Sequence, residues 1–244
     1  MIDKTEKKQG DNYLSKVYSY ERRPKSDYPE KLAKHLCEKY IYKEKGKLLD
    51  IGCGRGDMLK AFEKNKFSVF GIDLSKESVE MCYPINVQNI NLEDENFNYN
   101  EGNFDVIFSK SLIEHLNNPI NFMNSCKKLL SENGCLVIMT PSWIHHGWGP
   151  FYLDHTHRTP FTLQSLRDLG NLAGFENVKV EYFYQLPIVW KYSFFKIIAK
   201  LVSFLKIPYL PMYEGLTSIK WPNNLNKFFR FSNEVMLIAI CKKK

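Results

Sequence analysis

A short apolar run that leads directly into three alternating glycines constrains the fold of this chain more than any other segment. The run reads Leu48-Leu-Asp-Ile-Gly-Cys-Gly-Arg-Gly-Asp-Met-Leu59, with glycines at positions 52, 54 and 56. Glycine allows a sharp backbone turn and a close approach by a ligand, because it carries no Cβ atom. The segment 57–65 that follows has the apolar spacing of a helix. This order predicts a buried strand, a tight ligand-binding turn and a helix.

Two carboxylates indicate which ligand this turn suits. Asp73 follows the next predicted strand, 67–72, and lies 21 residues after Gly52, the distance at which an acid binds ribose hydroxyls. Asp57 occupies the position at which a dinucleotide-binding turn carries its third glycine. A carboxylate there repels a pyrophosphate but accepts a cationic or neutral group. The two acids therefore predict S-adenosylmethionine, which carries sulfonium and ammonium charges, in preference to NAD.

Apolar runs and amphipathic segments alternate from residue 47 onward. Further strands are predicted within 86–100 and at 104–108, 134–140, 178–184 and 234–241, and further helices at 76–82, at 120–131 and from Thr162 to Gly174. We expect an α/β fold, with a Rossmann-like, seven-stranded, mostly parallel sheet and helices on both faces. A single domain over 1–244 is predicted, with an arm and helix at 1–46, a cofactor-binding core at 47–184, an insert or substrate cap at 185–233, and a last strand with a basic tail at 234–244.

Four segments, in this order and spacing, resemble the class I S-adenosylmethionine-dependent methyltransferases. They are 49–56 (Leu-Asp-Ile-Gly-Cys-Gly-Arg-Gly), 71–75 (Gly-Ile-Asp-Leu-Ser), 103–116 (Asn-Phe-Asp-Val-Ile-Phe-Ser-Lys-Ser-Leu-Ile-Glu-His-Leu) and 129–138 (Leu-Leu-Ser-Glu-Asn-Gly-Cys-Leu-Val-Ile). The resemblance covers roughly residues 45–185. It implies the fold and the cofactor specifically, and says much less about the methyl acceptor.

The same resemblance implies where the cofactor binds. The residues it assigns to S-adenosylmethionine are Asp50, Gly52, Cys53, Gly54, Gly56, Asp73, Leu74, Asn91, Leu92 and Ser109. In this assignment the glycine turn faces the methionine part, Asp73 faces the ribose, and the residues at 74, 91 and 92 face the adenine. The backbone at Ser109 or Lys110 lies below the sulfonium.

Methyl transfer is an in-line displacement, so the enzyme aligns an acceptor atom with the sulfonium methyl and helps to remove the proton of a hydroxyl acceptor. Two clusters follow the predicted fourth and fifth strands: Glu114 with His115, and His155 with His157. Histidine has a reference pKa of about 6.5, so each imidazole is a candidate base at neutral pH. His115 has a second interpretation, in which it only caps a helix or lines the cofactor site.

These four side chains are also a candidate ligand set for a divalent metal ion that orients and acidifies an acceptor hydroxyl. The segment is similar to O-methyltransferases of ubiquinone synthesis and of small-RNA 2′-O-methylation, in which the metal-binding motif is Glu-x-x-Glu-His. Here the motif reads Ser111-Leu-Ile-Glu114-His115, so its first carboxylate is missing. We therefore expect catalysis without a metal.

The segment 141–161 and the long aromatic insert resemble small methyltransferases of bacterial surface-glycan pathways. That resemblance implies O-methylation of a sugar, a sugar nucleotide or a phosphate-linked group in capsule or lipopolysaccharide biosynthesis. Candidate acceptor-binding residues are Trp143, His145 and Tyr152, for packing and hydrogen bonding, and Arg158, for a phosphate or carboxylate. Packing within the loop is the alternative interpretation of His145 and the aromatic residues.

The distribution of charge favours an anionic acceptor. The net charge is +7, but residues 48–140 carry −5, whereas residues 1–47 and 141–244 carry +5 and +7. A nucleic-acid substrate is a second hypothesis, which the lack of a compact basic patch in the sequence disfavours. A third is an enzyme at the membrane surface acting on a lipid or lipid-linked acceptor, since Ile188–Ile207 combines apolar residues with four lysines. Six cysteines without a C-x-x-C pair and an N-terminus without a signal peptide predict a cytoplasmic protein.

Overall fold

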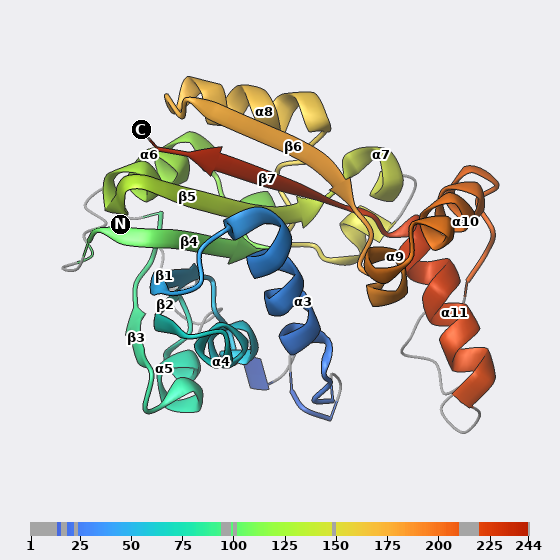
Figure 1. Cartoon of the computed structure of the whole chain (residues 1–244), viewed down its shortest axis with the longest axis horizontal. Helices are drawn as coiled ribbons and strands as arrows, with labels where there is room; N and C mark the ends of the chain where they lie inside the picture. The colour runs from blue at the N-terminus through green and yellow to red at the C-terminus, as the bar shows by residue number, and fades with distance from the viewer. Residues whose placement is uncertain are drawn as a thin grey trace.

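A seven-stranded sheet forms the centre of the computed structural model, which describes residues 14–15, 19–21, 24–93, 99, 102–147, 150–209 and 220–243 (Figure 1). The strand order is β3-β2-β1-β4-β5-β7-β6. Neighbouring strands are parallel from β3 to β5, and β7 is antiparallel to both β5 and β6. The strands are β1 (Gly46–Ile51), β2 (Phe67–Asp73), β3 (Asn86–Asn89), β4 (Phe104–Lys110), β5 (Leu130–Pro141), β6 (Asn177–Phe183) and β7 (Met236–Lys242). The predicted seven-stranded, mostly parallel fold is confirmed.

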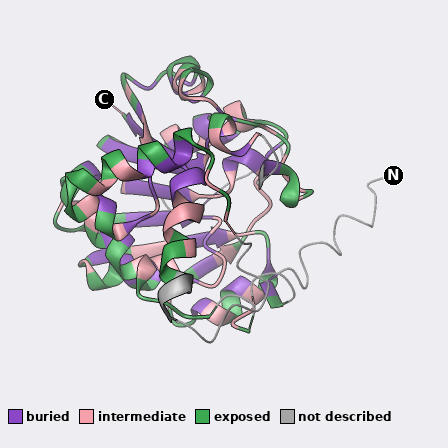
Figure 2. Cartoon of the chain, turned by 90° about the vertical axis from the view of Figure 1, so that its right-hand side faces the viewer, coloured by how far each residue is buried: buried purple, intermediate pink, exposed green. Residues whose placement is uncertain are grey.

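Alternating side chains explain why helices cover both faces of this sheet. Successive residues of a strand point to opposite faces. Leu48 and Val106 pack in one buried cluster with the helices on their face, whereas Leu49 and Ile107 pack in another. The first cluster is covered by α3 (Tyr28–Leu36) and α4 (Asp57–Lys64), and the second by α6 (Pro119–Leu129) and α8 (Leu163–Leu172). Figure 2 shows the buried strands between helices whose outer sides are exposed.

The boundaries of most predicted helices agree with the structure. Helix α5 (Lys76–Cys82) has the predicted limits. Thr162 caps α8, since its Oγ1 accepts from Ser165 N at 3.1 Å while Ser165 Oγ accepts from Thr162 N at 2.9 Å. The predicted helix 120–131 was too long, because Leu130 is already buried in β5, where it pairs with Phe104.

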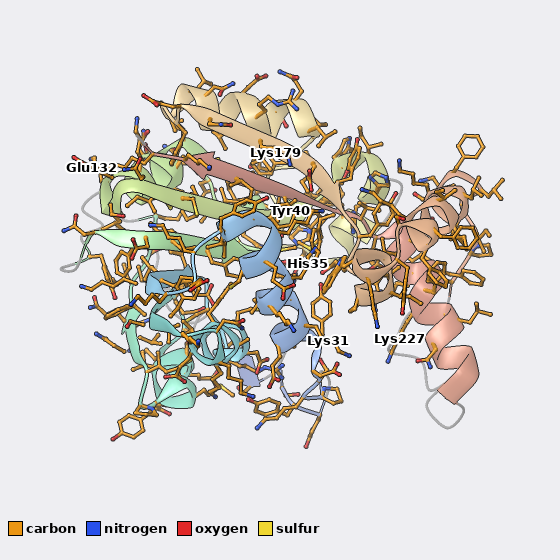
Figure 3. The ribbon with its side chains drawn as sticks, in the orientation of Figure 1. Lys31, His35, Tyr40, Glu132, Lys179 and Lys227 are labelled. Carbon is orange, nitrogen blue, oxygen red and sulfur yellow. The ribbon has the colours of Figure 1, made fainter. Side chains whose placement is uncertain are left out.

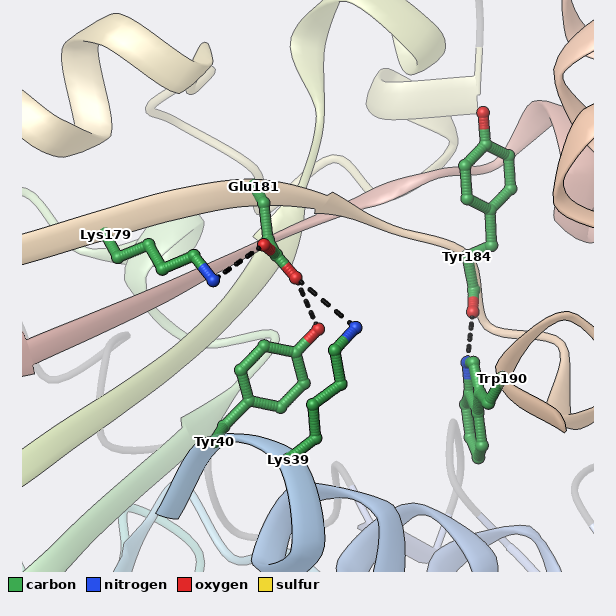
Figure 4. Close-up of polar contacts among 6 residues, drawn as sticks. All are labelled: Lys39, Tyr40, Lys179, Glu181, Tyr184 and Trp190. Atoms are coloured by element: carbon green, nitrogen blue, oxygen red, sulfur yellow. Dashed lines mark hydrogen bonds and ion pairs between the residues drawn. The ribbon is translucent and has the colours of Figure 1, made fainter. Parts of the chain in front are cut away.

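The N-terminal helix and the edge strand β6 are tied together by polar and aromatic contacts. A short π-helical segment, η1 (Cys37–Ile41), continues α3. Its Tyr40 hydroxyl donates to Glu181 Oε1 of β6 at 2.5 Å, and Lys39 and Lys179 flank the same carboxylate (Figure 4). His35 of α3 stacks on Trp190 with ring centroids 4.7 Å apart. His35 and, on η1, Tyr40 both contact Phe183 of β6, and both are labelled in Figure 3.

The described residues of the predicted insert form three helices: α9 (Pro187–Lys191), α10 (Ser193–Phe204) and α11 (Lys220–Asn233). Within Ile188–Ile207, the extended backbone of Tyr192 separates α9 from α10. Trp190 Nε1 donates to the carbonyl of Tyr184 at 2.7 Å and anchors α9 to the end of β6 (Figure 4). Residues 1–13 of the predicted arm and 210–219 of the insert lie outside the described residues.

The three helices of the insert lie near the edge of the sheet at which the parallel strands end (Figure 1). They follow β6, which runs in the same direction as β5 because each strand is antiparallel to β7. The short helix α7 (Trp143–His146) follows β5 at this edge, and the turn η2 (Ile113–His115) follows β4. In the part of the chain that the structure describes, no helix is both long and apolar enough to cross a membrane.

Candidate active site

The glycine turn after β1 requires glycine at the positions that the sequence singled out. Gly52, Gly54 and Gly56 have φ values of +80°, +51° and +72°, a region that other residues rarely adopt. The Gly52 amide donates to the carbonyl of Ile72 at 2.8 Å, which fixes the start of the turn against β2. A Cβ atom at Gly56 would also lie 2.6 Å from Cys82 Sγ of α5. Backbone conformation and close packing therefore both select glycine here.

Asp73 joins this turn to the loop after β2. Its Oδ2 accepts from Gly54 N at 2.7 Å, and its Oδ1 accepts from Ser75 N at 2.8 Å. Burial raises the pKa of this carboxyl, and the two backbone hydrogen bonds oppose that rise. Each carboxylate oxygen has more than one lone pair, so these bonds leave acceptor capacity for ribose hydroxyls.

The residues assigned to the adenine lie around Asp73. Leu74 follows it and is more than half exposed. The Ile90 amide donates to the carbonyl of Asp73 at 3.0 Å, which places the end of β3, and with it Asn91 and Leu92, next to this loop. The structure thus gathers the glycine turn, Asp73, Leu74, Asn91 and Leu92 at one edge of the sheet.

Three other predicted cofactor residues, in or next to the turn, have buried side chains. Asp50 is 2% exposed, and burial followed by the charge of Asp73 raises its pKa. Cys53 is buried, with its Sγ 3.4 Å from Ser78 Oγ. The Ser109 hydroxyl donates to the carbonyl of Ile51 at 3.0 Å and holds β4 against β1. Their side chains support the loop, and any contact with a cofactor by Ser109 would use its backbone.

Part of the N-terminal segment also reaches the glycine turn, which the sequence did not predict. Arg55 Nη2 lies 2.7 Å from Asp57 Oδ2, and the guanidinium of Arg55 lies over the Tyr20 ring at 4.3 Å. Leu14 is buried, with its Cδ2 3.7 Å from where a Cβ at Gly54 would be. Because Asp57 forms an ion pair with Arg55, it is not an isolated negative charge. The electrostatic repulsion that it would exert on a pyrophosphate is therefore that of an ion pair. The N-terminal segment has no helical or strand-like apolar pattern from which these contacts could have been predicted.

A second group of site residues centres on Glu114 in the turn η2. Glu114 is fully buried, and Thr140 Oγ1 donates to its Oε2 at 2.9 Å. Its Oε1 has no hydrogen-bond partner among the described residues. Burial raises the pKa of this carboxyl to about 7, against smaller lowering effects that include the Thr140 bond. A buried carboxyl with a free oxygen and a shifted pKa is typical of a functional site.

His115 and His157 lie beside Glu114, and their hydrogen bonds define their tautomers. The single proton of the Thr156 hydroxyl is donated to Asp154 Oδ1 at 2.5 Å, so His115 Nδ1, at 2.9 Å from the same hydroxyl, is the donor in that contact. His157 Nδ1 donates to the carbonyl of Phe151 at 2.6 Å. In the neutral form, both imidazoles therefore have an unprotonated Nε2.

The two histidines and Glu114 form one compact group. The imidazole centroids are 4.6 Å apart, and one potential ligand atom from each of Glu114, His115 and His157 lies within 4.8 Å of the others. The amides of Arg158 and Thr159 donate to the carbonyl of Glu114 at 2.8 and 3.0 Å, which fastens the histidine loop to η2. His155, predicted with this group, is exposed and is not part of it.

The histidine group adjoins the glycine turn at the same edge of the sheet. Strand β4 pairs directly with β1, so the turns that follow these strands are neighbours. A Cβ at Gly52 would lie 3.3 Å from both terminal methyl groups of Leu112, two residues before Glu114. A cofactor on the glycine turn would therefore lie close to the histidines.

A cluster of aromatic residues adjoins the histidine group through Phe151. Phe151 packs against His157 with ring centroids 4.6 Å apart and against Tyr152 at 5.0 Å. Trp143 contacts Phe151 at 5.6 Å, and Tyr152 is 60% exposed. Arg158 is exposed and its guanidinium donates to Asn117. The structure thus places the predicted acceptor residues Trp143, Tyr152 and Arg158 near the histidines.

His145 is held by different contacts. Its Nδ1 lies 2.9 Å from Ser142 Oγ, and its ring packs edge-on against Tyr182 of β6 at 4.8 Å. Burial, followed by the positive charge of Lys206, lowers its pKa to about 4. These contacts suit the packing interpretation of His145 better than direct acceptor binding.

Known proteins match the chain in both sequence and fold. The sequence is 32% identical over 105 residues to the ubiquinone biosynthesis O-methyltransferase of Haemophilus ducreyi, a match that covers 38% of this chain and 44% of that relative. The chain thus spans less than half the length of the curated relatives that it matches. An S-adenosylmethionine-dependent methyltransferase structure from Archaeoglobus fulgidus has a TM-score of 0.61 at 20% identity and covers 93% of this chain and 98% of its own.

A third similar protein was solved with a cofactor product. It is an N-methyltransferase from Haemonchus contortus bound to S-adenosylhomocysteine, with a TM-score of 0.59 at 17% identity over 88% of this chain and 52% of its own. At these identities, the structural matches establish the fold. The model of one family, the methyltransferase domain, matches residues 20–180 and so includes the glycine turn, Asp73 and the histidine group. The chain therefore belongs to the methyltransferase domain family.

Proposed function

We propose that this protein transfers the methyl group of S-adenosylmethionine to a hydroxyl oxygen of a small acceptor, with His115 or His157 as the base. The observation that carries this proposal is the pair of imidazoles with unprotonated Nε2 atoms, next to the turn that would hold the cofactor. A nitrogen with a free lone pair can accept the hydroxyl proton as the oxygen attacks the methyl carbon. The name of the H. ducreyi relative, an O-methyltransferase, supports oxygen as the acceptor atom.

The surroundings of His115 suit a base at neutral pH. Burial lowers its pKa, as does the neighbouring His157, so the neutral imidazole predominates at pH 7. Asp154 is ionised, because its bonds from Thr156 and its two histidine neighbours outweigh the burial that raises its pKa. When His115 takes up a proton, the chain from His115 through Thr156 to Asp154 supplies a nearby negative charge. This arrangement stabilises the imidazolium without a change of tautomer.

The acceptor that we propose is small and anionic, such as a sugar nucleotide or a phosphorylated sugar of surface-glycan biosynthesis. Arg158, on the loop fastened to η2, is a charge partner for a phosphate or carboxylate, and Trp143 and Tyr152 offer aromatic faces. The basic excess of residues 141–244 supports the same choice. An intermediate of ubiquinone biosynthesis is the competing acceptor class, which the relatives' names support.

The Glu114, His115 and His157 group also fits a divalent cation. Two imidazoles and one carboxylate suit Zn²⁺ or Mn²⁺ better than Mg²⁺, which prefers oxygen ligands. Glu114 Oε1, which has no described partner, would then be a ligand. A bound cation would lower the pKa of an acceptor hydroxyl. The protein residues would still hold and orient the acceptor, and the missing carboxylate at Ser111 makes a metal-free base our first choice.

The direct test of this proposal is a screen of acceptors for release of S-adenosylhomocysteine. We expect turnover with at least one sugar nucleotide or phosphorylated sugar, and the same rate within about twofold after treatment with EDTA. Turnover of quinone precursors or of RNA, without any reaction of the sugars, would contradict the proposed acceptor. A loss of activity in EDTA that Mn²⁺ or Zn²⁺ restores would assign the histidine group to a metal.

Substitution of the histidines separates the base from its neighbours. We expect His115→Gln or His157→Gln to lower kcat by about 10²- to 10⁴-fold, the usual contribution of a general base, while the affinity for S-adenosylhomocysteine changes less than about threefold. Steady-state kinetics and calorimetry give the two values. His155→Gln is the matched control, since His155 is exposed in the same loop. An equal loss of kcat in all three variants would refute this assignment.

Glu114 predicts a pH dependence of stability. Because the pKa of Glu114 is raised from its ordinary value of 4.5 to about 7, the folded state binds more protons than the unfolded state between these pH values. The contribution of Glu114 is therefore greatest at low pH and is lost as the pH rises through about 7. We expect the Tm of Glu114→Gln, relative to the native protein, to increase from pH 5 to pH 8.

Thermal unfolding at pH 5, 6, 7 and 8 measures this difference. The exposed Glu132, on the opposite end of β5, provides the control variant Glu132→Gln (Figure 3). Its Tm difference from the native protein should stay constant over the same range. A constant difference for Glu114→Gln as well would show that the buried carboxyl does not titrate there.

A further inference from the structure

A row of large apolar side chains on α10 faces solvent. Phe204 is 82% exposed, and each of the other residues in the row is more than half exposed. The row consists of Phe194, Ile197, Leu201, Phe204 and Leu205. At 100° per residue these positions fall within about a quarter of the helix circumference. Ala199 and Val202, on other sides of α10, are buried, and Ala199 packs in a cluster with Val189 and Val235. The apolar row is therefore not needed for packing within the described chain.

The charged residues of the three described helices of the insert are all basic, and one of them, Arg230, pairs with Glu234 directly after α11. Residues 187–207 and 220–233, which include α9, α10 and α11, contain seven lysines and arginines and no aspartate or glutamate. Lys196 and Lys200 are exposed on α10 beside the row, and Lys191 and Lys206 flank its two ends. Lys227 adds a further exposed lysine on α11 (Figure 3). A surface of this kind is electrostatically complementary to a dense anionic surface.

We propose that α10, with its apolar row and its lysines, is a docking surface for an anionic lipid bilayer. An apolar face enters the boundary between headgroups and acyl chains, while lysines contact lipid phosphates, as in amphipathic helices that lie in the membrane plane. A second copy of this chain is a poorer occupant, because two such surfaces would bring lysines against lysines. The exposed phenylalanines have no role in a purely electrostatic contact with a soluble anion.

The proposed surface lies near the acceptor side of the site. Lys206, at the end of α10, is close enough to His145 of α7 for its charge to act on that imidazole. Trp143, also on α7, contacts Phe151 beside the histidine group. Docking through α10 would therefore bring the acceptor side of the enzyme near the bilayer. The inference does not depend on the proposed methyl transfer, since membrane binding is measured without an acceptor.

Co-sedimentation of the full chain with vesicles tests this surface. We expect the protein to pellet with vesicles of phosphatidylcholine that contain about 30% phosphatidylglycerol, and to stay in the supernatant with pure phosphatidylcholine. An increase of NaCl from about 0.1 M to 0.5 M should weaken binding at least threefold, since the Debye length falls. A protein that stays in the supernatant with both vesicles, or pellets equally with both, would overturn the proposal.

Two pairs of variants locate the contact. Phe204→Ser with Leu205→Ser, and Lys196→Glu with Lys200→Glu, should each reduce binding to the anionic vesicles at least fivefold. Leu172→Ser on α8 is the matched apolar control, because Leu172 is 80% exposed on another helix, and Lys128→Glu on α6 is the charge control. Equal binding by all variants would exclude α10. Sedimentation velocity tests whether the native protein forms a dimer. A dimer that is abolished by Phe204→Ser with Leu205→Ser would assign the surface to a second copy of the chain and overturn the proposal.

Discussion

The carboxylate of Asp73 holds together the two loops on which the rest of the site depends. It accepts one hydrogen bond from the turn after β1 and one from the loop after β2, and it does so from a largely buried position. Charge-assisted bonds of this kind are among the stronger ones in proteins. The bond from Gly54 restrains the middle of a turn in which three glycines have positive φ values. Asp73 therefore links the two loops, and its carboxylate oxygens keep further acceptor capacity.

The histidine group depends on this arrangement through the pairing of β1 with β4. Leu112 packs against Gly52, and the turn that carries Glu114 and His115 follows directly. Glu114 retains a buried oxygen without a described partner, an arrangement that costs about 1–3 kcal/mol in ordinary proteins. Buried carboxyl groups with a raised pKa are concentrated at functional sites of proteins. The glycine turn and the histidine group are thus placed by adjacent strands of one sheet.

Local sequence patterns were sufficient to predict the fold and to identify residues that lie together at the glycine turn. The spacing from the glycine turn to Asp73 is set within one strand-helix-strand unit, so it is visible in the sequence. Consecutive apolar residues such as Leu48 and Leu49, which point to opposite faces of a strand, indicated a sheet covered on both faces. The Thr162 cap likewise depends on a residue only three positions away.

The acceptor side could be predicted only in part, because its contacts join distant residues. His115 meets Thr156, 41 residues later, and Glu114 meets Thr140, 26 residues later. Neither threonine belongs to a sequence motif that would predict its hydrogen bond. The exclusion of His155 and the position of His145 against Tyr182 likewise arise from tertiary packing. The sequence predicted these histidines as one group, but only the fold showed which of them lie side by side.

Calorimetric titration with S-adenosylhomocysteine tests most directly whether the turn held by Asp73 is the cofactor site. We predict that Asp73→Ala weakens binding at least tenfold, or about 1.4 kcal/mol. Asp57 pairs with Arg55, and we predict that Asp57→Asn weakens binding less than about threefold. Equal and negligible effects of the two substitutions, in proteins with unchanged Tm, would contradict this assignment of the cofactor site.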